Sequence, residues 1–495
     1  MIRKALVLAL LSYGSSALAQ PDPAAPPTPT PVEPPAPPTP PTEPPATPTY
    51  MPPSDEPPPP PPPTAPTSTP TMVKGKTELT FYGFIELLGM YDTTQNLNEQ
   101  MQNSGIARPG TYAGNHGATQ LSARHSRLGL KIAQPVTNSI KATGQFEMDF
   151  LGNQPGNPSS ATAAAGASEG QFYQNAPFRF RHVFAKLETP YLDIVAGQWW
   201  SLFGWQSSFH PNSVEIQGLP GQVYKRTAQL RLAKTIKTGA VDIDLAIGAQ
   251  RPPQRDSATP DGVAAIKFTS TSFKGWHTKG ANDSGLDGAS LGASVIGRRF
   301  AVDELSAAPS KQVVVHGYGL SLDAMIPIIP ATKASHDNAL TLTGSFVTGA
   351  GIADQYDGLN FGVANPSLPN PSMAATPPTY FPNIDAGLAQ YASDGTLHAV
   401  QVTTYMAGLQ YYLPGGMAWV ALNYAHLKSG NAANFGAKAW TEGQFLDANL
   451  FVDITPTWRV GLEVMQNKQT FAVAAANGTT DATNNRVEGM VMLLF

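Results

Sequence analysis

Apolar and polar side chains alternate along much of the chain. In residues 139–150 every second side chain is apolar or small, and the intervening ones are polar or charged. The pattern returns in residues 241–247 and 458–464. Such a period of two is typical of a β-strand with one apolar face. No segment keeps a helical period over three turns, so we expect an all-β fold over residues 73–495.

Sixteen segments of this kind predict sixteen strands. They span residues 78–91, 120–133, 139–150, 178–188, 191–198, 222–234, 240–249, 262–270, 288–299, 313–325, 339–348, 398–412, 417–427, 444–452, 458–466 and 485–495. Most connections between them alternate long and short. The long ones are 92–119, 151–177, 199–221, 349–397, 428–443 and 467–484. The connection 271–287 is long where the alternation calls for a short turn, which indicates an elaborated turn or a local error in the strand limits.

Strand length and number favour a membrane barrel. Most segments match the ~9–11 residues of a tilted membrane strand better than the ~5–6 of an ordinary strand. A sixteen-stranded barrel has a lumen too wide for side chains to fill, so its apolar face must meet lipid. We therefore expect a transmembrane antiparallel up-and-down β-barrel of about sixteen strands. The chain ends on Phe495, whose place on an amphipathic strand is typical of the insertion signal of bacterial barrels.

The first residues predict export. Residues 1–19 combine a basic start, a short apolar run and a small-residue cleavage site after Ala19, as in a secretory signal peptide. Residues 20–72 contain 26 of the 48 prolines and predict a disordered, polyproline-rich arm before the barrel domain at 73–495. The arm is a plain spacer, or its residues 21–72 contact the cell wall. The expected location is the outer membrane of a Gram-negative bacterium.

Composition and motifs exclude several classes of function. The chain of 495 residues has no Cys, which rules out disulfides, thiolate catalysis and Cys-ligated metal. A net charge of −4 argues against a nucleic-acid partner. The nine His stand singly, and neither a phosphate-binding loop nor a nucleophile motif is present. We expect no enzymatic activity, no cofactor and no metal.

Charged side chains on the strands are the candidates for pore lining. A charge facing lipid at mid-depth costs about 2–4 kcal/mol, so most should face the lumen. The expected pore-lining residues are Arg127, Arg179, Arg181, Lys225, Arg231, Glu147, Asp149, Asp242 and Asp244. A column of guanidiniums would attract anions and orient carboxylates, although some of these bases could simply pair with the acids or lie at the rim. The face of the second strand stays ambiguous, because outward Leu128, Leu130 and Ile132 would also put Arg124 outward.

The connection 199–221 is too aromatic for a solvated loop. We expect it to fold into the lumen as a constriction, with packing against a neighbouring subunit or the rim as the alternative. The residues expected to form the constriction are Trp199, Trp200, Phe203, Trp205 and Glu215.

Residues 178–182, 196–203 and 215–221, with Arg226 and the segment 229–231, resemble the DcaP-like porins of Gram-negative outer membranes. This resemblance implies a sixteen-stranded barrel, a homotrimer, an inward-folded third loop and uptake of small anions such as dicarboxylates. By motif position it implies that Arg179, Arg181 and Arg231 line the pore. Members of that family carry a helical, coiled-coil-like segment before the barrel, whereas this chain carries the Pro-rich arm.

Together these observations predict an outer-membrane porin for passive diffusion of small hydrophilic solutes, with a preference for anions. Its expected partners are outer-membrane lipid, small anionic solutes and further copies of itself. The alternative is a structural barrel that ties the envelope to the cell wall through the Pro-rich arm. An adhesin that uses the connection 349–397 is a third interpretation.

Overall fold

The computed structural model describes residues 70–95, 99–152, 173–174, 176–281, 283–306, 309–332, 336–366 and 383–495. They belong to one compact unit, Thr64–Phe495. The expected signal peptide and all but the last three residues of the expected Pro-rich arm lie outside the described residues.

Strands dominate the described residues. They are β1 (Thr71–Lys74), β2 (Thr77–Asp92), β3 (Ala118–Ser122), β4 (Arg127–Pro135), β5 (Lys141–Asp149), β6 (Arg179–Glu188), β7 (Asp193–Trp200), β8 (Arg226–Lys237), β9 (Val241–Gln250), β10 (Asp261–Gly280), β11 (Asp283–Asp303), β12 (Gln312–Ile329), β13 (Leu340–Ala350), β14 (Ala389–Tyr391), β15 (Leu397–Ala399), β16 (Gln401–Tyr412), β17 (Ala418–Lys428), β18 (Trp440–Asp453), β19 (Trp458–Phe471) and β20 (Asp481–Leu494). Short 3-10 helices lie in the connections. They are η1 (Ala113–Asn115), η3 (Phe203–Trp205), η4 (Ala353–Gln355) and η6 (Ala432–Phe435).

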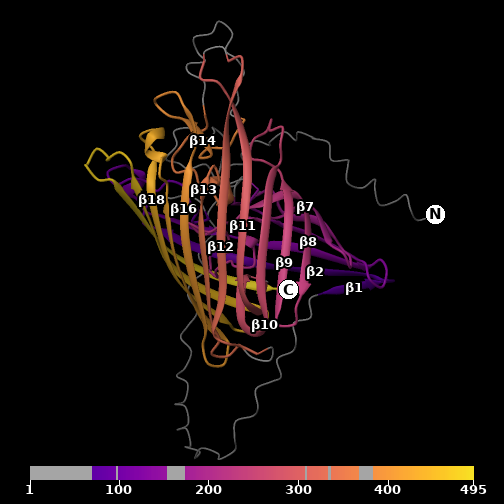
Figure 1. Cartoon of the computed structure of the whole chain (residues 1–495). Coiled ribbons are helices and arrows are strands. Elements are labelled where there is room, and N and C mark those ends of the chain that lie inside the picture. The colour runs from indigo at the N-terminus through magenta and orange to yellow at the C-terminus, as the bar shows by residue number, and fades with distance from the viewer. Residues whose placement is uncertain are drawn as a thin grey trace, which may run out of the picture. The chain divides into compact units, whose positions relative to one another are not determined.

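The strands form a closed antiparallel barrel of 16 strands, as expected, in which β3 and β4 together make one strand of the wall. Each wall strand pairs with its neighbours in sequence, and β20 pairs back onto β2 to close the ring. Figure 1 shows the wall strands side by side, with β14 among the connections at one end. β14 and β15 form a separate hairpin.

The barrel closes through the two ends of the described chain. β20 pairs with β2 from Phe84–Leu494 to Asp92–Arg486. Beyond that ladder the N–H of Gly83 donates to the carbonyl of Phe495 at 2.9 Å, and the N–H of Phe495 donates back at 3.1 Å. β1, which the sequence pattern missed, pairs with the first residues of β2. It covers the part of that edge that β20 does not reach, so little of the edge is left to pair with another chain.

The two faces of the wall differ as the alternation predicts. On β20, Val487 and Val491 are exposed on the outside, whereas Arg486 and Glu488 are buried inside. Leu, Ile, Val and Phe side chains are exposed in the same way on β2, β8, β11, β12 and β18. An apolar exterior with a polar interior is the arrangement of a transmembrane barrel.

An interruption between β3 and β4 resolves the ambiguous second strand. Residues 123–126 leave the ladder, and the N–H of Ser126 donates to the carbonyl of Ala123 in a turn. The turn resets the alternation, so Arg124 is buried inside although Leu128 is exposed outside. The expectation that an outward Leu128 would put Arg124 outward is therefore wrong.

Of the two alternatives for residues 271–287, the structure shows the local error in the strand limits. β10 continues to Gly280 and β11 begins at Asp283, so only two residues join them. The register shifts between Thr269 and Lys274, where the hairpin departs from the wall. The sequence pattern did not predict these residues as strand, because this part of the hairpin does not face outward and needs no apolar face. We call residues 271–287 the crossing hairpin.

The crossing hairpin reaches strands far from its own place in the wall. The N–H of Thr278 donates to Gln410 Oε1 on β16 at 3.0 Å, and Gln410 Nε2 donates to the carbonyl of Thr278 at 2.9 Å. At the tip, Arg459 Nη1 on β19 donates to the carbonyl of Ala281 at 3.1 Å. Because these partners point inward, the hairpin crosses the barrel interior near the end at which Phe495 lies.

Candidate pore lining and constriction

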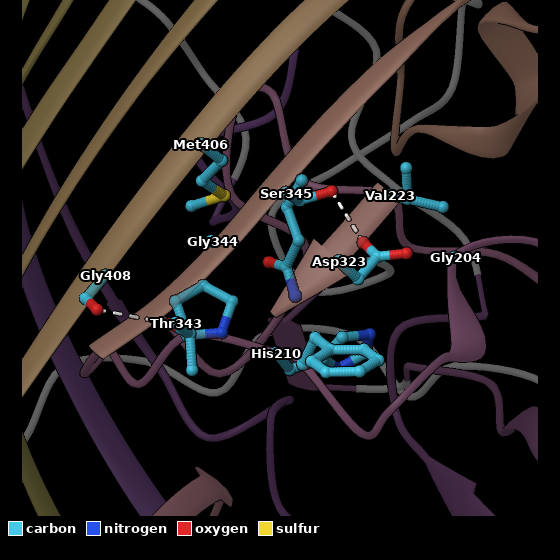
Figure 2. Close-up of a pocket in the computed structure, with 12 residues that line it drawn as sticks. Gly204, His210, Val223, Asp323, Thr343, Gly344, Ser345, Met406 and Gly408 are labelled. Atoms are coloured by element: carbon cyan, nitrogen blue, oxygen red, sulfur yellow. Dashed lines mark hydrogen bonds between the residues drawn. The ribbon is translucent and has the colours of Figure 1, made fainter. Parts of the chain in front are cut away.

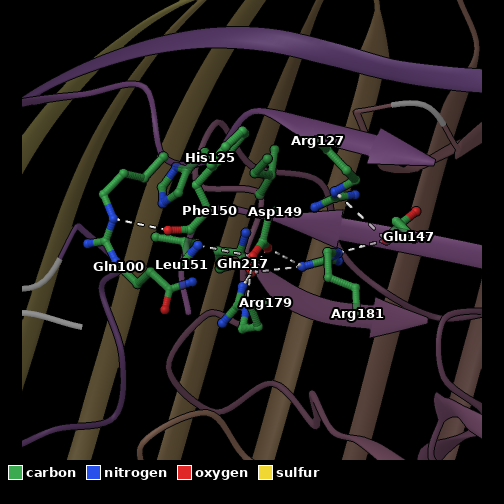
Figure 3. A network of polar contacts seen from close by, with 12 residues as sticks. Gln100, His125, Arg127, Glu147, Asp149, Phe150, Leu151, Arg179, Arg181 and Gln217 are labelled. Carbon is green, nitrogen blue, oxygen red and sulfur yellow. Dashed lines mark hydrogen bonds and ion pairs between the residues drawn. The ribbon is translucent and has the colours of Figure 1, made fainter. Parts of the chain in front are cut away.

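Arginines and carboxylates from β4, β5 and β6 form one network inside the barrel (Figure 3). Arg181 Nε donates to Glu147 Oε1 at 2.7 Å, and its Nη1 donates to Asp149 Oδ2 at 3.2 Å. Arg179 binds Asp149 through two hydrogen bonds of 3.0 and 2.7 Å. Arg127 lies 3.8 Å from Glu147. These five expected pore-lining residues therefore come together.

A local irregularity concentrates polar groups here. The pairing of β5 with β6 shifts register between Glu147 and Met148. The shift breaks the strict alternation of β6, so Arg181 and His182 are both buried although they are adjacent in sequence. The ring of His182 packs edge-on against Trp200 at 5.2 Å between centroids.

Arg231 lies on the same side of the interior but outside the network. Its Nη2 donates to the carbonyl of Trp200 at 2.6 Å, and its guanidinium lies 4.7 Å from the centroid of the Trp199 ring. In the part of the chain that the structure describes, it forms no ion pair with a carboxylate. We call Arg127, Arg179, Arg181 and Arg231 the basic wall.

The other expected pore-lining residues lie apart from this network. Asp242 and Asp244 are on the inward face of β9, and Asp244 lies 3.4 Å from Lys267 Nζ. Lys225 precedes β8 rather than lying in it, and its Nζ is 3.7 Å from Asp354. The expected lining residues thus divide between the arginine network, the β9 carboxylates and the start of β8.

The expected constriction starts later than the sequence indicated. Trp199 and Trp200 are the last residues of β7, so their assignment to a loop is wrong. They extend the strand because they pair with Thr227 and Arg226 of β8. The connection itself comprises residues 201–225, which we call loop 201–225.

Loop 201–225 begins with a buried aromatic turn. Phe203 and Trp205 belong to η3, and both are buried. Trp205 Nε1 donates to the carbonyl of Ile266 on β10 at 2.8 Å. Gly204 adopts φ 76°, and a Cβ there would lie 3.2 Å from Val223. The turn is thus fixed against the inside of β10 and against the end of the loop.

The middle of the loop reaches the opposite side of the barrel. Trp419 Nε1 on β17 donates to Asn212 Oδ1 at 2.8 Å. The N–H of Val214 donates to Asn449 Oδ1 on β18 at 2.8 Å. The N–H of Glu215 donates to Glu463 Oε2 on β19 at 2.7 Å. Since loop 201–225 starts from β7 and returns to β8, these contacts carry it across the interior.

Loop 201–225 covers a group of carboxylates that belong to four strands. We call this group, Glu86, Asp447, Glu463 and Glu488, the acidic wall; all four are buried. Burial raises the pKa of Glu215, which meets this group from the loop, and the nearby cations His125 and Arg486 oppose the rise. The carboxylates of the acidic wall are therefore shielded from solvent, whereas Arg179 keeps 23% of its side chain exposed.

The loop also leaves a small cavity against β12, β13 and β16 (Figure 2). Its volume is about 20 Å³, room for about one water molecule. Within it Ser345 Oγ donates to Asp323 Oδ1 at 2.8 Å. The space between loop 201–225 and strands β12, β13 and β16 is therefore nearly filled by side chains.

A larger cavity of about 400 Å³ lies at the opposite end of the barrel from Phe495. The starts of β6 and β8 line it on one side and the connection 351–400 on the other. We call it the loop-end cavity. Its charged lining includes Arg226, Asp354, Asp357 and Asp385, none of which was expected as a site residue. Of these, only Arg226 stands in a motif that the resemblance used.

In the ranges that the structure describes, no three His, Cys, Asp or Glu side chains are grouped to hold a metal ion. No helix of those ranges is long and apolar enough to cross a membrane.

A closed sixteen-stranded barrel with a polar interior crossed by the loop after its fifth strand has the porin fold. The chain is similar to the crystal structure of the outer membrane channel DcaP of Acinetobacter baumannii, with 18% identity, a TM-score of 0.56, and 86% of this chain and 99% of that chain covered. It is also similar to OmpF of Salmonella typhi in complex with daunomycin, with 10% identity, a TM-score of 0.46, and 86% and 100% covered. No protein-family model matches the chain. No curated protein matches it either.

The likeness to DcaP agrees with the resemblance of residues 178–231 to DcaP-like porins. At this level of identity the likeness defines the fold. The function of a barrel of this fold depends on the side chains inside it.

Proposed function

We propose that the protein is an outer-membrane porin through which small hydrophilic solutes diffuse passively, with a preference for anions. The observation that carries the proposal is the accessible charge inside a closed barrel with an apolar exterior. Of the basic residues, Arg179 and Lys225 keep 23% and 29% of their side chains exposed, whereas Arg181 and Arg231 are buried. Loop 201–225 covers the acidic wall. Exposed cations that line a lumen attract anions and repel cations.

The charge balance of β4 to β8 supports the anion preference. Glu147 and Asp149 are the carboxylates that pair with the basic wall, and both are shared among several guanidiniums. Arg231 has no carboxylate partner in the described chain. Lys225 keeps 29% of its side chain exposed. The local excess is therefore positive.

The test is the reversal potential of the purified protein in a planar bilayer under a salt gradient. We expect a steady conductance with a potential of anion-selective sign. Arg179→Gln together with Lys225→Gln removes two accessible charges and should reduce the anion preference by about two- to fivefold. Lys311→Gln, whose side chain is 74% exposed on the connection after β11, is the matched control.

Each result has a distinct meaning. A cation-selective current would contradict the anion preference, but the proposal that the protein is a pore would still stand. An unchanged potential in the double variant would show that these two side chains do not set the selectivity. The resemblance to DcaP-like porins further supports a homotrimer in the outer membrane of a Gram-negative bacterium. The pattern of residues 1–19 supports export by a signal peptide that is cleaved after Ala19.

The filled interior favours a second candidate function, a structural barrel. Loop 201–225 and the crossing hairpin both bridge the lumen, and the ring nitrogen of His277 lies 2.9 Å from the carbonyl of His210 where they meet. Absence of any conductance would favour this candidate. Deletion of residues 21–72 would then weaken the envelope if the arm contacts the cell wall.

A further inference from the structure

We infer that the loop-end cavity binds a small dipolar solute, one that carries a carboxylate and an ammonium group, such as an amino acid or a short peptide. The inference rests on the proposed function, because it needs an open pore. The anion preference of that pore concerns small inorganic ions, whereas the inference concerns larger organic solutes that occupy the cavity. The volume of about 400 Å³ lies in the range of small-molecule sites.

The cavity carries both signs of charge on separate elements. Arg179, Lys225 and Arg226 lie at the starts of β6 and β8. Asp354, Asp357 and Asp385 face them from the connection 351–400. Three basic and three acidic groups give a formal charge of zero but a dipole across the cavity.

Two of the six groups are already engaged in ion pairs with residues outside the lining. Arg179 makes two hydrogen bonds to Asp149. Asp354 lies 2.5 Å from Arg298 Nη1. Lys225 is held only loosely, at 3.7 Å from Asp354. The groups left for a ligand are therefore Arg226 with Lys225 on one side, and Asp357 with Asp385 on the other.

Arg226 is oriented by aromatic rings rather than by a carboxylate. Its guanidinium lies 5.0 Å from the centroids of both Trp200 and Tyr224, and its Nη1 donates to the hydroxyl of Tyr224 at 3.3 Å. It forms no ion pair with any described carboxylate. A guanidinium fixed in this way retains donors for an incoming carboxylate.

The opposing carboxylates have no ion pair within the described residues either. Asp357 accepts from Asn103 through its backbone carbonyl, and Asp385 donates through its backbone N–H. Burial raises the pKa of Asp357, while the guanidiniums of Arg179 and Arg226 oppose the rise. Asp357 and Asp385 line the cavity together with Arg179, Lys225 and Arg226, so an ammonium group in the cavity would meet side chains without an ion pair.

This arrangement discriminates against solutes of a single sign. A solute with two carboxylates would place one of them against Asp357 and Asp385. A solute with only ammonium groups would meet Arg226 and Lys225. A dipolar solute aligned across the cavity satisfies both sides.

The test measures block of the single-channel current by three related solutes. Glycylglycine is dipolar, N-acetylglycine has only the carboxylate, and glycylglycinamide has only the ammonium group. We expect glycylglycine to block at about a threefold lower concentration than either of the others. Asp357→Asn should raise its half-blocking concentration about threefold and leave that of N-acetylglycine unchanged or lower.

Two further variants separate specific from general effects. Arg226→Gln should raise the half-blocking concentrations of both glycylglycine and N-acetylglycine. Asp394→Asn removes a carboxylate of the connection 351–400 that is exposed between β14 and β15. It should leave the half-blocking concentrations of all three solutes unchanged.

The outcomes distinguish this inference from the proposed function. A conducting channel that three solutes block equally would overturn the inference and leave the porin. Equal effects of Asp357→Asn and Asp394→Asn on the half-blocking concentration of glycylglycine would also overturn the inference and leave the porin. A protein without conductance would overturn the proposed function and the inference with it.

Discussion

Arg181 illustrates how a charged side chain is held inside this barrel. It is 2% exposed and binds Glu147, Asp149 and the hydroxyl of Tyr224. A buried charge is tolerated only when its partners compensate for the lost hydration, and removing one partner leaves the others unpaired. The network therefore links β5 and β6 to the end of loop 201–225.

Arg181→Met should destabilise the folded barrel by about 3–5 kcal/mol, because it leaves two buried carboxylates with fewer cations. The measurement is the free energy of unfolding in urea. Arg179→Met is the comparison, since 23% of the Arg179 side chain is exposed and solvent screens its interactions. Equal losses in the two variants would show that burial does not determine the strength of these pairs.

Glu215→Gln tests the electrostatic contact between loop 201–225 and the acidic wall. Because burial raises the pKa of Glu215, the docked loop retains the proton to higher pH than the free chain does. Docking is therefore strongest below the ordinary carboxyl pKa of about 4.3 and weakens as pH rises through the raised pKa. We expect current fluctuations of the wild-type channel to increase as the pH rises above the ordinary carboxyl pKa of about 4.3.

The variant should lose this increase, because its amide does not ionise. Glu188→Gln, at the end of β6 and away from the loop, should retain it. Fluctuations of the wild-type current that decrease with rising pH would contradict the assignment of the pH dependence to Glu215.

At the scale of single residues, alternation predicted the inward side of Glu147, Asp149, Arg179 and Arg181, because a strand of period two fixes the face of each side chain. It could not predict Asp357 and Asp385. They lie in a connection without periodicity, and only the folded chain brings them opposite Arg226.

At the scale of elements, the predicted strands match the observed ones best where one face is apolar. The ends are less well predicted. β18 starts at Trp440 and β19 ends at Phe471, several residues beyond the expected limits. Apart from the buried aromatic rings of Trp440 and Phe471 at their ends, those extensions are mostly polar and lack an apolar face, although strand pairing continues through them. The crossing hairpin could not be predicted because its partners are polar side chains from distant strands.

The crossing hairpin yields a prediction about conductance. Replacing residues 274–287 with a two-residue turn should raise the single-channel conductance about twofold, because flow depends on the narrowest section of a pore. Gly275→Val should raise the conductance by less. A Cβ at this position would lie 2.6 Å from Pro327 Cβ, so the hairpin must shift. Shortening the connection 304–311 is the control. Unchanged conductance would place the narrowest section elsewhere.

At the scale of the whole molecule, the fold class followed from strand number and length, and β20 closes the barrel on β2. The sequence did not reveal β1, which is short and has both faces exposed. The internal arrangement of loop 201–225 follows from its contacts with β17, β18 and β19, and these contacts exist only after the ring has formed.

Deletion of Phe495 should reduce the fraction of assembled barrel several-fold. The deletion removes both backbone hydrogen bonds to Gly83 at the closing seam, together with the expected insertion signal. The measurement is the migration of unheated protein on a denaturing gel. Phe495→Tyr keeps the aromatic ring and the backbone bonds, and should assemble normally. Full assembly of the deleted form would contradict a role for the terminal residue.

The closing seam also determines how fast the protein can fold. Asn484 Nδ2 donates to Asp92 Oδ1 at 2.6 Å across 392 residues of chain. Pairings over such sequence separations form slowly, because the entropy of closing the loop is lost before the contacts compensate for it. Until the seam forms, β2 and β20 each have an unpaired edge that can join another chain. Assembly must therefore compete with aggregation, and a factor that holds the two edges apart until the last strand arrives would increase the yield more than one that stabilises the finished barrel.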